Sequence, residues 1–201
     1  VETMRAITGT CTGNITASKA TAQEATFKYA WFWDHPPIMK LKDSVAMRWL
    51  AYDKNGYEVD VTKTSEKCSI SYYWNNRVQF TRSGTQEPDL DFNSLNIQFD
   101  EAENFQSSTT MTEEAYAGNG YVRVSVKVEP EVHNSISYLK VAALYGHTTV
   151  GVGSPSIGLS PAGTISISFS GTINSVIDSI AGDKVKITKT EDPNSPNVSD
   201  I

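Results

Sequence analysis

The sequence has no apolar run near the roughly 20 residues that a bilayer-spanning helix needs, so no membrane span is predicted. It also lacks the charged and then apolar leader that is typical of a signal peptide. Long helical patterns of Leu, Ala, Glu and Lys are missing, whereas Ser, Thr, Val, Ile, Tyr and Asn are prominent. These absences disfavour a membrane protein or a helical bundle, and the residues that are present favour β-structure.

Basic residues are scarce as well. Lys and Arg number 17 against 23 Asp and Glu in 201 residues, which gives a net charge of −6 and a pI near 5.1. Such a balance argues against general nucleic-acid binding, which needs a basic surface, and against electrostatic binding to anionic membranes. With 39% hydrophobic residues, the chain still has enough apolar side chains to build a core.

Signatures of catalysis are missing too. The three histidines, His35, His133 and His147, show no metal-ligand spacing, and no GxSxG motif is present. His35 lies beside Pro36 and is interpreted as a turn residue, and His147 as a histidine packed or exposed in a sheet. The sequence therefore predicts no catalytic residue, no metal and no cofactor, and a protein that is not an enzyme.

Three weaker signals for a chemical site stay open. A pair of glycosidase carboxylates needs a defined separation in a cleft, which sequence alone does not place. Asp89 and Asp91 resemble the start of a calcium loop, but Ser94 replaces the required Gly, so only a looser calcium site remains as an alternative. A lysine isopeptide crosslink through Lys28 or Lys127 is the third alternative, and no partner residue for it is visible.

Only two cysteines are present, Cys11 and Cys68, and their spacing is not that of a zinc site. They lie in separate β-like stretches. A secreted β protein is where a disulfide is expected, so we predict that Cys11 and Cys68 are bonded. Two buried free thiols are the alternative.

Aromatic residues recur at every second position from Ala25 to Trp33. In a strand, alternate side chains share a face, so these rings line one face, either as part of a core or as an open sugar-stacking platform. We expect a core, whose aromatics are Phe27, Tyr29, Trp31, Trp33, Trp49, Tyr72 and Trp74. Phe32 and Tyr73 fall on the opposite faces and are better candidates for exposed contacts.

Other stretches supply apolar rows that could cover this face. The clearest rows are Val45/Met47/Trp49/Ala51, Cys68/Ile70/Tyr72/Trp74 and Val122/Val124/Val126/Val128. Turn residues separate the strands, as at Asn55-Gly56 and Asn75-Asn76, whereas residues 100–120 look like a long loop or a short helix. The pattern predicts an all-β protein, an elaborated antiparallel β-sandwich of immunoglobulin-like or jelly-roll type, with about ten to twelve strands.

The two ends differ from the middle. We expect a domain over residues 19–190, preceded by a weak N-terminal strand segment, 1–18, and followed by a polar tail, 191–201. The chain starts at Val1, not methionine, which is interpreted as a processed N-terminus. Sequons at Asn14 and Asn197 are candidate glycosylation sites.

The Thr/Ser-rich strands and acidic pI are similar in composition to exported prokaryotic surface proteins, including subunits of filaments built by donated strands. This resemblance favours a non-enzymatic structural subunit of an extracellular filament or surface assembly. Its partners would be copies of itself, joined when residues 1–18 add to a neighbour's sheet edge. The alternatives are a secreted carbohydrate- or surface-binding module and a virion structural protein.

Overall fold

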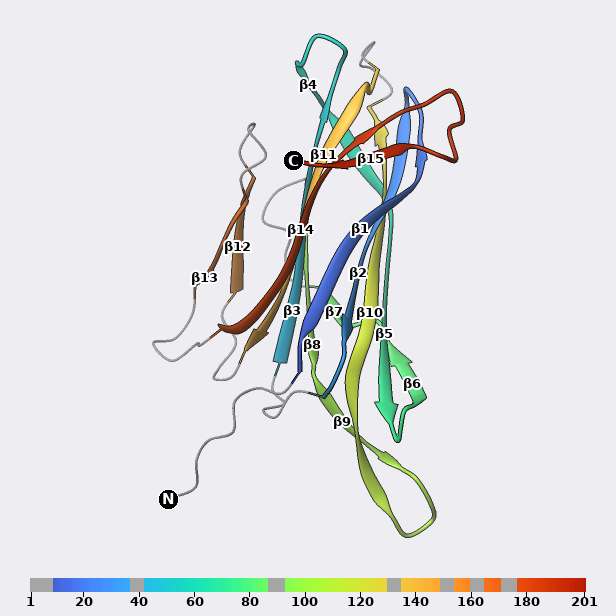
Figure 1. The fold of residues 1–201 in the computed structure, drawn as a ribbon, viewed down its shortest axis with the longest axis vertical. Coiled ribbons are helices and arrows are strands. Elements are labelled where there is room, and N and C mark those ends of the chain that lie inside the picture. Colours follow the sequence, from blue (N-terminus) through green and yellow to red (C-terminus); the bar gives the residue numbers. More distant parts are fainter. Residues whose placement is uncertain are drawn as a thin grey trace.

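The computed structural model describes residues 9–36, 42–86, 93–129, 135–148, 154–159, 165–170 and 177–201. For residues 148, 154–159, 165–170 and 177–181 it describes the backbone alone. Within these ranges the chain forms fifteen strands and no helix, and hence none with the length and apolar character of a membrane span. Two antiparallel sheets pack face to face, which confirms the predicted all-β sandwich (Figure 1).

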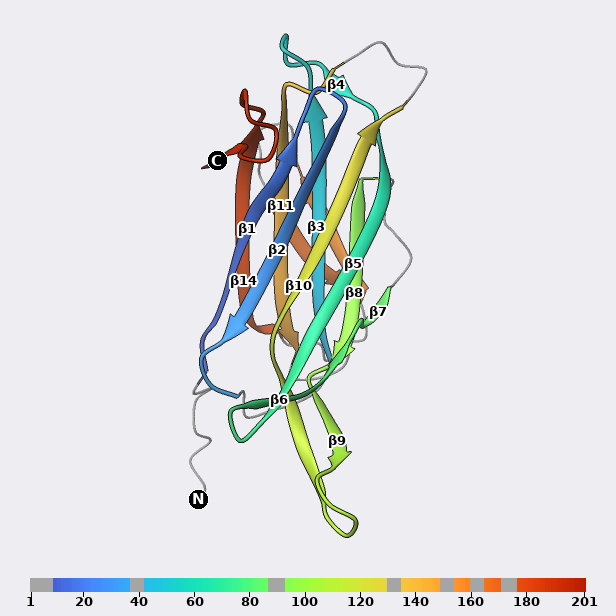
Figure 2. The ribbon, with the colours of Figure 1, turned by 90° about the vertical axis from the view of Figure 1, so that its right-hand side faces the viewer.

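Sheet A consists of six strands, and every neighbouring pair is antiparallel. In spatial order they are β1 (Cys11–Ala20), β2 (Glu24–Trp33), β10 (Thr112–Val128), β5 (Val61–Trp74) and β6 (Arg77–Arg82), and β9 (Ala102–Gln106) pairs with β10. The hairpin of β9 and β10 extends beyond the other strands (Figures 1 and 2). The loop or helix expected at residues 100–120 is therefore wrong.

Sheet B consists of seven antiparallel strands and faces sheet A. In spatial order they are β15 (Asn197–Asp200), β14 (Ile177–Thr188), β11 (Tyr138–Thr148), β3 (Lys42–Tyr52), β8 (Ser94–Asp100) and β7 (Thr85–Gln86), and β4 (Glu58–Val59) pairs with β3. A separate hairpin of β12 (Ser154–Leu159) and β13 (Ile165–Ser170) lies against β3 (Figure 1). The strand count exceeds the prediction because several paired segments are very short.

The core lies between the two sheets and is rich in aromatic rings. Of the seven aromatics expected there, Phe27, Tyr29, Trp31, Trp33, Trp49 and Tyr72 are buried, and Trp74 is half-buried at the margin. Trp31 stacks on Phe99 across the core, with ring centroids 5.7 Å apart. The four-ring row of β2 is thus part of the sandwich interior, and it is not an open platform.

Two predicted turns are confirmed by their backbone angles. Gly56 has a φ of 83°, and the Asp53 carboxylate accepts hydrogen bonds from the backbone of Asn55 and Tyr57. Asn75 and Asn76 have φ values of 48° and 60°, which asparagine tolerates better than most residues. These turns fix the register of the strands on either side.

The two ends of the described chain are held by their own domain. β1 pairs with β2 along its whole length and buries Ile15, so the boundary expected after residue 18 falls inside a strand. At the other end β15 pairs with β14, and Val198 packs against the core. The polar tail therefore docks on its own sheet.

The predicted disulfide between Cys11 and Cys68 is wrong, because both thiols are free. Cys11 lies in β1 and Cys68 in β5, with β2 and β10 between them. Three strand spacings amount to about 14 Å, whereas a disulfide needs its Cα atoms within about 7 Å. Burial raises the pKa of each thiol to about 12, so both are protonated at neutral pH.

Candidate functional site

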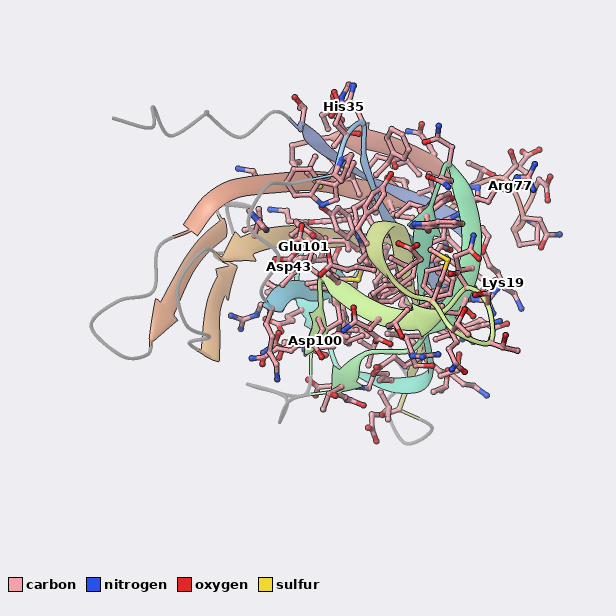
Figure 3. All side chains as sticks on the ribbon, turned by 90° about the horizontal axis from the view of Figure 1, so that it is seen from below. Lys19, His35, Asp43, Arg77, Asp100 and Glu101 are labelled. Atoms are coloured by element: carbon pink, nitrogen blue, oxygen red, sulfur yellow. The ribbon has the colours of Figure 1, made fainter. Side chains whose placement is uncertain are left out.

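Three ionisable side chains meet inside the sandwich, at the end where β3 begins and β11 ends. Asp43 continues the inward row of β3, and the strand register places it directly opposite His147 of β11. Glu101 follows β8, which also pairs with this end of β3. All three side chains have 0% exposure, and Figure 3 shows Asp43 and Glu101 close together in the interior.

His147 binds both carboxylates through one ring nitrogen. Its Nδ1 lies 2.9 Å from Asp43 Oδ1 and 3.2 Å from Glu101 Oε2. The Tyr145 hydroxyl donates to the second oxygen of Asp43, and it accepts a hydrogen bond of 2.9 Å from Trp33 Nε1. Because Trp33 belongs to sheet A and Tyr145 to sheet B, this buried ionic network (Asp43, Glu101, His147 and Tyr145) links the two sheets.

The pKa values of His147 and Tyr145 show which groups of this network hold a proton at neutral pH. Burial alone would lower the pKa of His147, but hydrogen bonds to Asp43 and Glu101, and the charges of both, raise it to about 10. Burial raises the pKa of Tyr145 well above its ordinary value, and the charges of Asp43 and Glu101 add to the effect. At neutral pH a histidinium ion therefore lies between the two acidic side chains, and Tyr145 stays a neutral donor.

The network suits structure better than chemistry on a substrate. Among the described residues, Asp43, Glu101 and His147 are the group whose ligand atoms, all within 4.8 Å of one another, could hold a metal ion. The Nδ1–oxygen separations are hydrogen-bond distances, and a metal would require the imidazole to lose its proton. All three side chains are fully buried, so they form an interior ion pair of sheet B, which the hydrogen bond between Tyr145 and Trp33 joins to sheet A.

Sequence reasoning missed this network. His147 was assigned only to a sheet, and Asp43 and Glu101 were not singled out. Asp43 stands two residues before the inward row that starts at Val45. The alternation of β3 could therefore have predicted that the Asp43 side chain points inward. Glu101 lies beyond the last residue of β8, so no strand alternation predicts that its side chain is buried.

The outer face of sheet A presents a second candidate site, an aromatic patch of Phe32, Tyr73, Tyr116 and Tyr121. Phe32 is 53% exposed, and the three tyrosines are half-buried. Strand register aligns Phe32 with Asn119, and Tyr73 with Tyr116. Asn119 Nδ2 donates to the Tyr73 hydroxyl at 2.8 Å. Phe32 and Tyr73, the two expected contact residues, thus belong to one surface, the outer face of sheet A. The strands of this sheet lie toward the viewer in Figure 2.

Sheet B does not present an equivalent face along β3. Of its outward residues, Ser44, Ala46, Leu50 and Tyr52 are buried and Arg48 is half-buried, and β12 lies against this strand. A groove of about 400 Å³ occurs elsewhere, lined by Leu144, Gly182, Asp183, Lys184, Asp200 and Ile201. Asp183 in that groove already accepts a hydrogen bond of 2.5 Å from the backbone of Ile15. Of these surfaces, sheet A combines rings with uncovered backbone strands.

The remaining candidates from the sequence are distributed over the surface or lie outside the description. His35 is exposed in a bend after β2, whereas His133 and the acidic residues Asp89 and Asp91 lie outside the described residues. Lys28 is half-buried and Lys127 exposed, both on the outer side of sheet A. The sequon asparagines Asn14 and Asn197 are exposed.

No protein-family model and no curated protein matches the sequence. One similar structure is of AvmM, described as catalysing macrocyclization in alchivemycin A biosynthesis; it has 10% identity and a TM-score of 0.35, over 92% of this chain and 90% of that chain. Another concerns pH-induced modulation of Streptococcus parasanguinis adhesion by Fap1 fimbriae, with 9% identity and a TM-score of 0.32, over 94% of this chain and 100% of that one. TM-scores this low carry no argument about function.

Proposed function

We propose that this chain is an exported, non-enzymatic surface module that binds carbohydrate through the aromatic patch on sheet A. The observation that carries the proposal is the position of the patch. Its rings lie on the open outer face, whereas the rings of the core lie on the inner face of the same strands. Phe32 points away from the core and is exposed, and three half-buried tyrosines lie on the same face, a grouping of rings that marks an interaction surface.

The neighbours of the rings fit a sugar better than an apolar partner. Thr12 and Asn119 stand directly opposite Phe32 on the two adjacent strands, and Ser71 stands opposite Asn119. Aromatic rings pack on the C–H faces of sugars, while hydroxyl and amide groups beside them bond to sugar hydroxyls. A sheet face with rings and polar groups on neighbouring strands therefore supports binding of an extended polysaccharide.

A glycan array probed with the purified protein tests this proposal. The double variant Phe32→Ala/Tyr121→Ala should bind the recognised glycans roughly tenfold more weakly or worse, since two stacking rings are lost. Tyr57→Ala is the matched control, because Tyr57 is 72% exposed but lies in the turn before β4. Absence of binding to every glycan, or equal binding by the double variant, would overturn the proposal.

A filament subunit is the second candidate, and the free edge of β5 favours it. β5 pairs with β10 along most of its length, but β6 covers only Ile70–Trp74. Within the described residues, positions 61–69 have no strand on their other side, and an unpaired edge accepts an added strand. Because β1 already completes its own sheet, donation of residues 11–18 would require β1 to leave β2.

Electron microscopy of the purified protein separates this candidate from the first. Strand addition predicts regular fibres, and an excess of a synthetic peptide of residues 1–18 should stop their growth by occupying the open edge. Fibres that grow equally well with the peptide, or a protein that stays monomeric at every concentration, would count against strand addition.

A further inference from the structure

Three cations lie in one cross-strand row on the outer face of sheet A. The register pairs Arg123 of β10 with Lys28 of β2 on one side and with Lys67 of β5 on the other. Arg123 and Lys67 are exposed and Lys28 is half-buried. These residues, here called the basic row, span about 10 Å, since neighbouring strands lie about 4.8 Å apart.

The basic row is unfavourable for the isolated fold. Like charges directly opposite each other on neighbouring strands are destabilising. Among the described residues, none of the three cations forms an ion pair, although Lys19, Lys63 and Arg82 elsewhere on sheet A each have an acidic partner. The chain as a whole is acidic, with a net charge of −6, so a row of unneutralised cations runs against its composition.

Protection of a sheet edge does not account for the row. Charged residues, lysine above all, keep exposed edge strands from pairing with other chains. Lys67 lies on β5, where that explanation applies, but Lys28 and Arg123 lie on β2 and β10, which have a partner on each side. Their charges stand in the middle of the sheet and face outward.

The row is continuous with the aromatic patch. Tyr121 lies two residues before Arg123 on β10, so the two side chains share a face at a separation of about 7 Å. Lys28 Nζ lies 5.9 Å from the centre of the Tyr121 ring, a cation–π contact that joins the two groups. One continuous strip of the outer face of sheet A thus carries the rings and polar groups at one end and the positive charges at the other.

We propose that this strip binds an acidic polysaccharide, with the rings packing against sugar faces and the basic row pairing with the anionic groups. The inference deepens the proposed carbohydrate function and rests on it. Arg123 is suited to carboxylate and sulfate groups because its guanidinium forms two parallel hydrogen bonds to them. The charge of the ligand offsets the repulsion within the row, which explains why three unpaired cations stand together on a face that also holds stacking rings.

A titration with polygalacturonate, heparin and neutral dextran tests the proposal, and the first two distinguish carboxylate from sulfate recognition. The wild-type protein should bind at least one acidic polymer, more weakly as salt rises, and dextran at least about tenfold less tightly. The triple variant Lys28→Gln/Arg123→Gln/Lys67→Gln should lose at least about tenfold in affinity for the acidic polymer at low salt.

Two controls keep the outcome specific. Lys54→Gln/Lys184→Gln/Lys189→Gln removes the same charge away from sheet A, and its affinity should stay within about twofold of wild type. Single-stranded DNA and vesicles with anionic lipids should bind far more weakly than the polysaccharide. Equal binding to DNA or to the vesicles would show general attraction to anions and overturn the inference.

Different results would exclude an acidic ligand and a carbohydrate site in general. If the row variant and the wild type bind acidic polymers equally, or if dextran binds as tightly as they do, the acidic ligand is wrong while a carbohydrate site stands. If the aromatic double variant also binds as the wild type does, the whole strip is excluded. Because the like charges of the row are unfavourable for the fold, the row variant should have a melting temperature equal to or above that of the wild type, and a loss of fold is detected independently by circular dichroism.

Discussion

Replacing His147 by glutamine tests the buried ionic network most sharply. Glutamine is close to histidine in size but carries no charge, so His147→Gln leaves Asp43 and Glu101 in the interior without their cation. Removing one partner from a buried ion pair costs about 3–5 kcal/mol of unfolding free energy. This is a large share of the roughly 5–15 kcal/mol by which domains are stable.

The stability that His147 contributes to the fold should fall as the pH rises. The pKa of His147 is about 10 in the fold against an ordinary 6.5, so between these values the folded state holds a proton that the unfolded state lacks. The stabilisation is fully present below about pH 6.5 and is lost as the pH rises, at about 1.4 kcal/mol per pH unit. From about pH 7 to about pH 8.5 the wild type should lose roughly 2 kcal/mol.

The pH window is limited by the two thiols. The pKa values of Cys11 and Cys68 are also raised, from 9.0 to about 12, so their contributions fall with pH in the same direction once the unfolded thiols ionise. Measurements below about pH 8.5 keep this contribution small.

Urea unfolding followed by tryptophan fluorescence is the assay, because urea, unlike guanidinium chloride, adds no salt that screens the charges. His147→Gln should flatten the fall in stability between the two pH values, whereas His35→Gln should keep it, since His35 is exposed. A wild type with equal stability at both values would refute the reasoning. Should the variant fail to fold, an NMR titration of the His147 imidazole in the wild type decides, and an apparent pKa near 6.5 would refute the network.

Two further predictions concern the core and the thiols. Trp31→Ala should lower the unfolding free energy by about 3–5 kcal/mol in urea. Trp31→Phe should lower it clearly less, because Trp31 Nε1 has no hydrogen-bond partner within the described residues. Equal losses for the two variants, or a negligible loss for alanine, would contradict a buried ring. Thiol labelling in urea should find both Cys11 and Cys68 reactive without prior reduction, and labelling of the folded protein should be slow. A disulfide recovered by mass spectrometry from the folded protein would contradict the strand order.

The fold class could be predicted from the sequence because apolar and polar residues alternate along several of its strands. Phe27, Tyr29, Trp31 and Trp33 keep one spacing, and the same spacing returns in the row that starts at Val122, so two faces in need of a partner were visible without coordinates. The hairpin of β9 and β10 was missed because its residues are mostly polar, and the few inward side chains, such as Phe105 and Ala115, form no run of apolar residues at alternate positions.

The sites depended on which strands become neighbours, and this is why sequence reasoning fell short of them. Cys11 and Cys68 both lie in strands, but the strand order separates them. His147 and Asp43 are far apart in the sequence and become a pair only through the register of β11 and β3. The sequence did single out Phe32 and Tyr73 by the face they occupy, whereas their alignment with Tyr116 and Tyr121 needed the order of β2, β10 and β5.

The binding surface on sheet A can be located by mapping amide shifts by NMR during a titration with an oligosaccharide that the glycan array identifies. The largest shifts should cluster on β2, β10 and β5, around Phe32, Tyr121 and Arg123. Shifts confined to the groove beside Leu144 and Ile201, or no shifts at saturating ligand, would contradict the claim that the outer face of sheet A is the binding surface.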